Sequence, residues 1–173
     1  MNSRQQSLAE GTLYTDMYEL TMAQLFFRMG MHEMKVHFEH FFRKYPDYGS
    51  HQAGYCINAG LEWFVDWMRS ACFTDEDIEC LRSQRRRNGE PMFADDFLKW
   101  LVKQSPMENF TVQAIPEGRV VHPGVPLTVV QGPFAMAQIM ETSLLNRLNF
   151  QTLVATKAAR VREAGCRRLM IEF

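Results

Sequence analysis

The sequence predicts an α/β protein, and three observations support this class. Apolar residues recur at helical spacing through much of the first hundred residues, for example at Leu20, Ala23 and Phe27. Short β-type segments separated by turns follow between residues 110 and 131. A long helical segment then leads into the apolar run 169–173, which suits a buried strand of a parallel sheet.

The first helix is expected to begin next to a capping residue. Thr15 or Asp16 is the candidate N-cap, and Glu19 is placed to reach back to it in a capping box. Gly30 is the candidate C-terminal cap of the same helix. Further helices are expected over residues 61–68, from the Thr74 cap through residue 81, and over residues 95–103.

Residues 34–43 predict a strand because their hydrophobicity alternates with a period of two. Met34, Val36, Phe38 and Phe42 form the apolar set expected to face the core, and His40 interrupts it. Three more strands are expected over residues 110–115, 119–122 and 126–131.

The region from residue 134 to residue 164 predicts a long helix, with a possible break near residues 149–150 and a cap at Gly165. On this basis residues 1–168 form an N-terminal α/β domain with long connecting helices, and residues 169–173 form a further strand. A parallel strand without a successor leaves unpaired backbone groups, so a companion segment or partner chain is expected beyond it.

The composition excludes several classes of function. The chain has 173 residues, with 19 Lys and Arg against 20 Asp and Glu, which argues for one domain and against a nucleic-acid-binding protein. No apolar run is long enough to span a membrane, and residues 1–10 lack a signal peptide, so a cytoplasmic location is expected. The histidines and cysteines lack the spacing of a metal site.

No generic catalytic motif is present, but a series of segments resembles one family in a single order. These segments are residues 13–23, 38–44, 59–62, 73–78, 116–118, 131–133, 141–146, 149–160 and 171–173. Across nearly the whole chain, the sequence resembles the N-terminal part of nicotinate phosphoribosyltransferases.

This resemblance implies a fold and an activity. The family fold is an N-terminal α/β domain followed by a type II phosphoribosyltransferase α/β barrel, whose first strand would be residues 169–173. The implied reaction converts nicotinate and phosphoribosyl pyrophosphate to nicotinate mononucleotide and pyrophosphate, with ATP hydrolysis and Mg²⁺, in NAD salvage. Family members are longer and usually dimeric, so this chain alone is expected to be incomplete and inactive. Its expected partner is a second copy of the chain or a companion C-terminal chain.

The resemblance also assigns residues to the nicotinate site. Tyr18, with Asp16 beside it, matches the tyrosine that reaches the neighbouring subunit's site and stacks near the base. Phe173 matches the aromatic residue on the other face of the base. Without the resemblance, Asp16 is better explained as a helix cap, and Tyr18 and Phe173 as core residues.

Thr156, Lys157 and Arg160 are the candidates for binding the anionic substrate. Thr156 and Arg160 share a helix face, and residues 157–168 contain five basic residues against one acidic residue. A solvated helix face is the alternative explanation. No catalytic residue is assigned, because the family's phosphorylated histidine would lie downstream of residue 173.

Two other functions remain open. One is a non-catalytic module of the same fold, which binds nicotinate or dimerises. The other is a quinolinate phosphoribosyltransferase, in which an arginine at the position of Thr142 would hold the second ring carboxylate. Thr142 supplies no such charge, so the resemblance favours a monocarboxylate base.

Overall fold

The computed structural model describes residues 10–50, 52–104, 107, 109–166, 168, 169 and 171. It contains α2 (Met17–Arg28), β1 (Lys35–His40), β2 (Cys56–Ile57), α3 (Leu61–Ser70), α4 (Asp75–Ser83), α5 (Asp95–Val102), β3 (Thr111–Ala114), β4 (Val120–Val121), β5 (Thr128–Pro133), α6 (Phe134–Ile139) and α7 (Glu141–Ala164). The predicted mixture of helices and short strands is confirmed.

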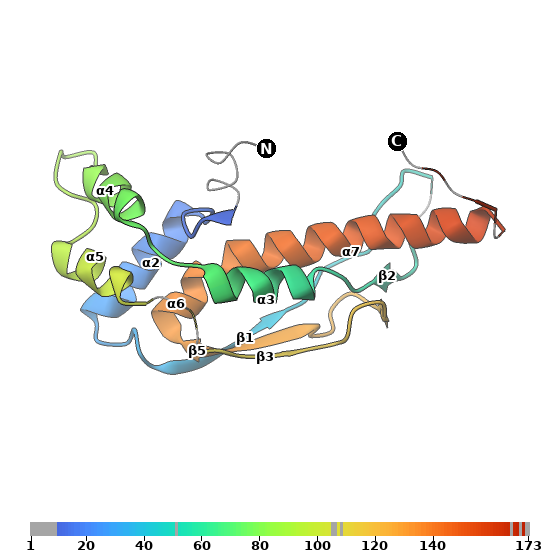
Figure 1. Ribbon diagram of the computed structural model, residues 1–173, viewed down its shortest axis with the longest axis horizontal. Helices are drawn as coiled ribbons and strands as arrows, with labels where there is room; N and C mark the ends of the chain where they lie inside the picture. Colours follow the sequence, from blue (N-terminus) through green and yellow to red (C-terminus); the bar gives the residue numbers. More distant parts are fainter. Residues whose placement is uncertain are drawn as a thin grey trace.

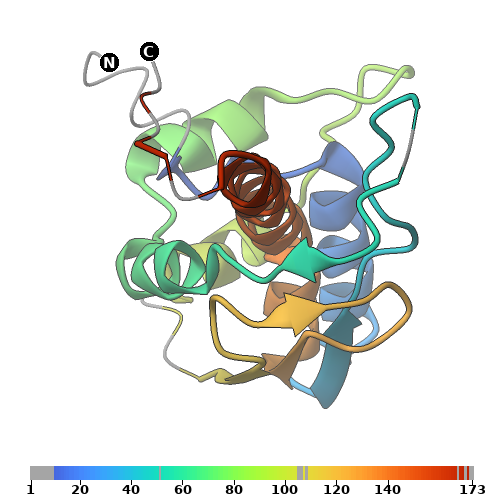
Figure 2. The same ribbon diagram turned by 90° about the vertical axis from the view of Figure 1, so that its right-hand side faces the viewer.

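Helix α7 runs along the long axis of the molecule, with α3 beside it (Figure 1). Helices α2, α4 and α5 gather at the end where α7 begins (Figure 1). Figure 2 looks along α7 and shows the strands on one side of it, where α7 packs against β2. The two ends of α7 therefore lie in different surroundings.

The strands form two small antiparallel sheets. β5 is the central strand of the larger sheet, and it pairs with β1 on one side and β3 on the other. Its residues alternate between buried and half-buried positions, as expected for a central strand with one face against the core. The smaller sheet pairs β2 with β4.

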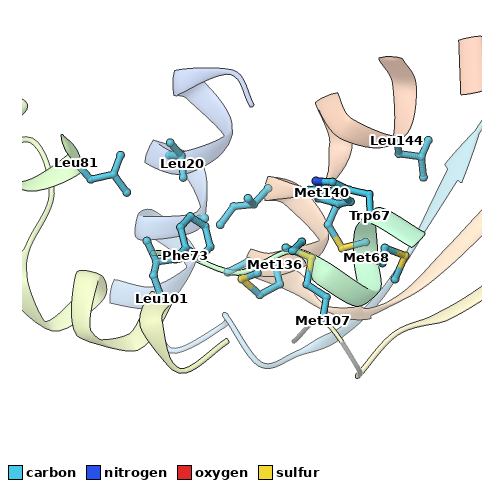
Figure 3. Packing of buried hydrophobic residues seen from close by; sticks show 14 of the residues in the cluster. Leu20, Trp67, Met68, Phe73, Leu81, Leu101, Met107, Met136, Met140 and Leu144 are labelled. Atoms are coloured by element: carbon cyan, nitrogen blue, oxygen red, sulfur yellow. The ribbon is translucent and has the colours of Figure 1, made fainter. Parts of the chain in front are cut away.

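The main core lies among the helices. Leu20 of α2, Trp67 of α3, Leu101 of α5 and Met136 of α6 are all buried in one cluster (Figure 3). The cap of α4 agrees with the sequence analysis, because Thr74 and Asp77 form the reciprocal bonds of a capping box.

Strand β1 departs from its predicted burial pattern. Met34 and Phe38 are exposed, whereas His40 is buried. The His40 imidazole Nε2 donates to Asn149 Oδ1 of α7 at 2.9 Å, and burial lowers the pKa of this histidine. His40 is therefore a buried polar contact between β1 and α7, and Asn149 lies inside a continuous helix.

The long C-terminal helical region is interrupted elsewhere than expected. The break comes at Met140, between α6 and α7, and the predicted break near residues 149–150 is wrong. Gly165 follows α7 in a right-handed conformation, and the positive φ of 45° falls on Cys166.

The strand predicted for residues 169–173 lies largely outside the described residues. Leu169 and Ile171 are described, and both are exposed and outside any strand. The division of the chain at residue 168 stays a prediction. Among the described residues, no helix is long and apolar enough to cross a membrane.

Candidate functional site

The start of α2 meets the start of α7 around one buried carboxyl group. Glu19 is completely buried, and its Oε1 accepts hydrogen bonds from the backbone N–H of Thr142 at 3.1 Å and from the Thr142 hydroxyl at 2.8 Å. Its Oε2 accepts a hydrogen bond from the Thr15 hydroxyl. The Thr142 N–H belongs to the first turn of α7, where amides lack intrahelical partners. Glu19 therefore caps α7 from another helix, and the capping box expected within α2 does not form.

Tyr18 lies at this junction and is 47% exposed. Its hydroxyl donates to Glu19 Oε1 across 3.5 Å. Desolvation of this hydroxyl, followed by the nearby Glu141 and Glu19 carboxylates, raises the pKa of Tyr18 to about 12. The phenol is therefore protonated at neutral pH, and its ring is not enclosed in the core.

Asp16 immediately precedes α2 and is exposed. It occupies the N-cap position, but its side chain makes no capping hydrogen bond. The helix-cap explanation for this residue is therefore absent from the structure, and its carboxylate is open to solvent beside Tyr18.

The stability of the folded chain should depend on the titration of Glu19. Burial raises the pKa of this carboxyl above 4.5, although the Thr15 and Thr142 hydrogen bonds act in the opposite direction. Because the folded state favours the protonated form, the stabilisation is complete below the unfolded-state pKa and is lost as pH rises through the folded-state pKa. Urea unfolding between pH 4 and 8 should show this loss relative to Glu19→Gln, and parallel curves for the two proteins would contradict it.

Thr156 is completely buried near the other end of α7. Its hydroxyl accepts from the backbone N–H of Ile57 at 2.9 Å and donates to the Thr152 carbonyl at 2.6 Å. Both partners are protein atoms, so in the described structure this side chain joins α7 to β2.

Lys157 and Arg160 lie nearer the surface. Lys157 is exposed, whereas Arg160 is half-buried. The Arg160 Nη1 donates to the Ala53 carbonyl at 2.7 Å, and its guanidinium lies 5.4 Å from the centre of the Tyr48 ring. Arg160 is thus oriented by the loop before β2.

The structure does not bring the two groups of predicted site residues together. Tyr18 lies beside Glu141, the first residue of α7, and Arg160 follows nineteen residues later on the same helix. At 1.5 Å per residue, this separation is about 28 Å. One small ligand cannot contact both ends within one chain. Phe173 lies outside the described residues, so its expected place opposite Tyr18 stays a prediction.

Three of the segments that carry the family resemblance meet around Gly60. Glu117 Oε1 accepts the backbone N–H groups of Gly60 and Leu61 and so caps α3. The Thr152 hydroxyl of α7 accepts the backbone N–H of Ala59 at 3.1 Å. We call Gly60, Glu117 and Thr152 the Gly60 hub. Its bonds join α3, α7 and the turn between β3 and β4.

Sequence reasoning missed the roles of Glu19, Thr142 and the Gly60 hub. One signal was available for Glu19, which stands one turn before Ala23 on a helix face that is otherwise buried. A carboxylate on such a face needs partners from another element. The identity of those partners depends on the tertiary fold.

A cavity of about 560 Å³ lies between α3, α7 and the chain before α2. Tyr14, Trp63, Trp67 and Phe150 give it aromatic walls. The guanidinium of Arg147 lies 4.9 Å from the centre of the Trp67 ring, and desolvation lowers the pKa of this arginine. Tyr18 does not line this cavity, so the two aromatic surfaces are separate features.

Comparison with known proteins agrees with the resemblance found in the sequence. Residues 13–149 match the family described as the nicotinate phosphoribosyltransferase (NAPRTase) N-terminal domain. Nicotinate phosphoribosyltransferase from Caenorhabditis elegans is 38% identical over 93% of this chain and 27% of its own length. The Bacillus subtilis protein of that name is 37% identical over 94% of this chain and 31% of its own length.

A solved structure supports the same relationship. The crystal structure of human nicotinic acid phosphoribosyltransferase superposes with a TM-score of 0.75 at 33% identity. The match covers 90% of this chain and 29% of the human chain, so this chain spans about three tenths of the length of that relative. With the match over residues 13–149, these similarities show that the chain belongs to the nicotinate phosphoribosyltransferase family and carries its N-terminal domain.

Proposed function

We propose that this chain supplies the N-terminal part of an enzyme that transfers the phosphoribosyl group of phosphoribosyl pyrophosphate to nicotinate. The products are nicotinate mononucleotide and pyrophosphate, in the salvage of NAD in the cytoplasm. The observation that carries the proposal is the exposed ring of Tyr18 at the α2–α7 junction, within a chain of this family.

The chemistry of the substrates suits the proposed residues. Nicotinate is a flat, electron-poor ring with one carboxylate, and the face of Tyr18 offers it a stacking surface. Phosphoribosyl pyrophosphate carries several negative charges, which Lys157 and Arg160 would attract. Asp16 lies beside Tyr18, and Phe173 is proposed for the opposite face of the base. Thr156 acts from within the protein, where it holds the helix that carries Lys157 and Arg160.

The site is proposed to lie between two chains. Tyr18 and Arg160 are too far apart to share one ligand within a chain, but the Tyr18 of one chain can approach the basic end of α7 in another. Tyr18, Met22, Leu25 and Met29 are exposed along one face of α2, as in a helix that packs against a partner. A homodimer is the preferred assembly. The alternative assembly pairs this chain with a companion C-terminal chain.

ATP and Mg²⁺ belong to the proposed reaction through the family resemblance. Across the described ranges, no three His, Cys, Asp or Glu side chains gather as a metal site. No step of the reaction is assigned to these two groups. The chain's own contribution is an aromatic surface for the base and positive charge for the phosphates.

The test is complementation. The 173-residue chain should release no pyrophosphate alone, because a lone N-terminal domain lacks the groups that stabilise the transferring centre. Joined to the segment that its relatives carry beyond this region, or mixed with it, the chain should turn over nicotinate but neither nicotinamide nor quinolinate. Turnover of nicotinate by the chain alone would contradict this expectation.

Two other outcomes identify the alternatives. A completed protein that binds nicotinate without turnover would be a non-catalytic module of the same fold. Preferential turnover of quinolinate would contradict the inference from Thr142, whose hydroxyl is already bonded to Glu19.

A further inference from the structure

We propose that Glu19 is a positioning residue for Tyr18, which it holds at the α2–α7 junction with the ring presented to the base. This inference rests on the proposed function of Tyr18. It adds that the buried Glu19 carboxyl, which touches neither substrate, determines the position of the Tyr18 ring.

One carboxyl group connects three parts of the chain. Glu19 Oε2 binds the Thr15 hydroxyl before α2, while Oε1 receives the Tyr18 hydroxyl and both donors of Thr142. The Thr15 hydroxyl also lies 3.1 Å from the Ile139 carbonyl at the end of α6. The backbone on both sides of Tyr18 is thereby fixed to the α6–α7 junction.

The Tyr18 hydroxyl donates to Glu19 Oε1 across 3.5 Å and is also hydrogen-bonded to the Glu141 side chain at the start of α7, so both carboxyl groups limit the freedom of the ring at its hydroxyl end. A side chain that is 47% exposed would otherwise exchange among rotamers, and binding a ligand would have to order it. Glu19 removes that cost in advance because it is completely buried and already satisfied by its protein partners. The expected consequence is tighter binding of the base without a change in the chemical step.

The test uses the completed enzyme, this chain together with the segment that its relatives carry beyond it. Glu19→Met keeps the length of the side chain but removes both oxygen acceptors. Glu19→Gln keeps Oε1 as an acceptor for Thr142 and Tyr18. We expect Glu19→Met to raise the KM for nicotinate about tenfold, with kcat and the KM for phosphoribosyl pyrophosphate unchanged, and Glu19→Gln to retain wild-type values.

Gln24→Met is the matched control. Gln24 is another buried polar residue of α2; its Nε2 donates to the Met92 carbonyl at 3.0 Å and its Oε1 accepts the Ala94 N–H at 2.6 Å. This variant also removes two buried hydrogen bonds from α2, so its loss of stability should be similar. Because Gln24 faces the chain before α5, the KM for nicotinate should not change.

A Tyr18→Ala background separates positioning from general damage. If Glu19 acts through the Tyr18 ring, Glu19→Met should add no further increase in KM once that ring is gone. An added increase of the same factor in the Tyr18→Ala protein would overturn the proposal.

A spectroscopic measurement makes the test independent of activity. The protein is labelled with 3-fluorotyrosine, and the Tyr18 line among those of the five tyrosines is assigned by its loss in Tyr18→Phe. The ¹⁹F line should move in Glu19→Met but not in Glu19→Gln or Gln24→Met. An unmoved line would overturn the positioning role. A moved line with an unchanged KM in both Glu19→Met and Tyr18→Ala would instead show that Tyr18 lies outside the base site, which overturns the proposed function and this inference with it.

Discussion

Gly60→Ala is expected to destabilise the folded chain by about 2–5 kcal/mol. Gly60 has φ of +100°, which side chains with a Cβ adopt only at a cost. A Cβ at this position would also lie 2.5 Å from the Arg147 carbonyl oxygen in the backbone of α7. Since neither α3 nor α7 can move away without breaking the Gly60 hub, urea unfolding should show a large decrease in the midpoint.

Gly118→Ala is the control for this prediction. Gly118 has φ of +78°, and a Cβ there would have no neighbour within 4 Å. It should therefore show only the conformational cost of about 1–2 kcal/mol. Equal decreases in the free energy of unfolding of the two variants would show that the close approach of α3 to α7 adds nothing to the cost of Gly60→Ala.

Phe97→Ala is expected to cost about 3–5 kcal/mol, because it opens a cavity in the helical core. The Phe97 ring is completely buried in α5. It stacks on Phe93 and Trp100, and meets Phe27 of α2 edge to face at 5.7 Å between ring centres. Its loss should also detach α5 from α2, which amide hydrogen exchange would report as faster exchange in both helices.

Phe150→Ala provides the comparison for this variant. It removes the same ring from a position that is 58% exposed, so its unfolding free energy should change by about 0.5 kcal/mol or less. A large loss in Phe150→Ala would mean that the aromatic wall of the cavity beside α3 also contributes to folding.

The helices were the most predictable part of the fold. Their apolar spacing is a local feature, and the Thr74 capping box formed as expected because all its atoms belong to four consecutive residues. The capping box expected within α2 did not form, because Glu19 instead binds Thr142 of α7. The strands after residue 110 were also located correctly to within a few residues, since turn residues separate them.

Long-range contacts decide the features that sequence could not predict. The helix break at Met140 coincides with a cap from Glu19, which is 123 residues away from Thr142. Strand β1 was expected to bury Met34 and Phe38, but α6 only partly covers this face, and the Phe38 and Phe134 ring centres are 6.2 Å apart. The contact of Glu19 with α7 and the packing of α6 on β1 both join residues far apart in the sequence, so local sequence patterns do not predict them.

The candidate site also combines features that the sequence predicted with features that depend on long-range contacts. The resemblance selected Tyr18 and Asp16, and the structure places both at the surface. Helix spacing and local charge selected Thr156, and its complete burial, in the same stripe of α7 as Leu148 and Thr152, was not part of that expectation. The group beneath Tyr18 is visible only when α2 and α7 are seen together.

The bonds of Gly60, Glu117 and Thr152 also bear on how enzymes are recognised in genomes. These atoms hold backbone to backbone across α3, α7 and a turn, and their hydrogen bonds go to the protein itself. A related protein that had lost its enzymatic activity would still need these hydrogen bonds to keep its fold. Sequence searches based on the segments that contain Gly60, Glu117 and Thr152 will therefore find inactive relatives as well as active enzymes.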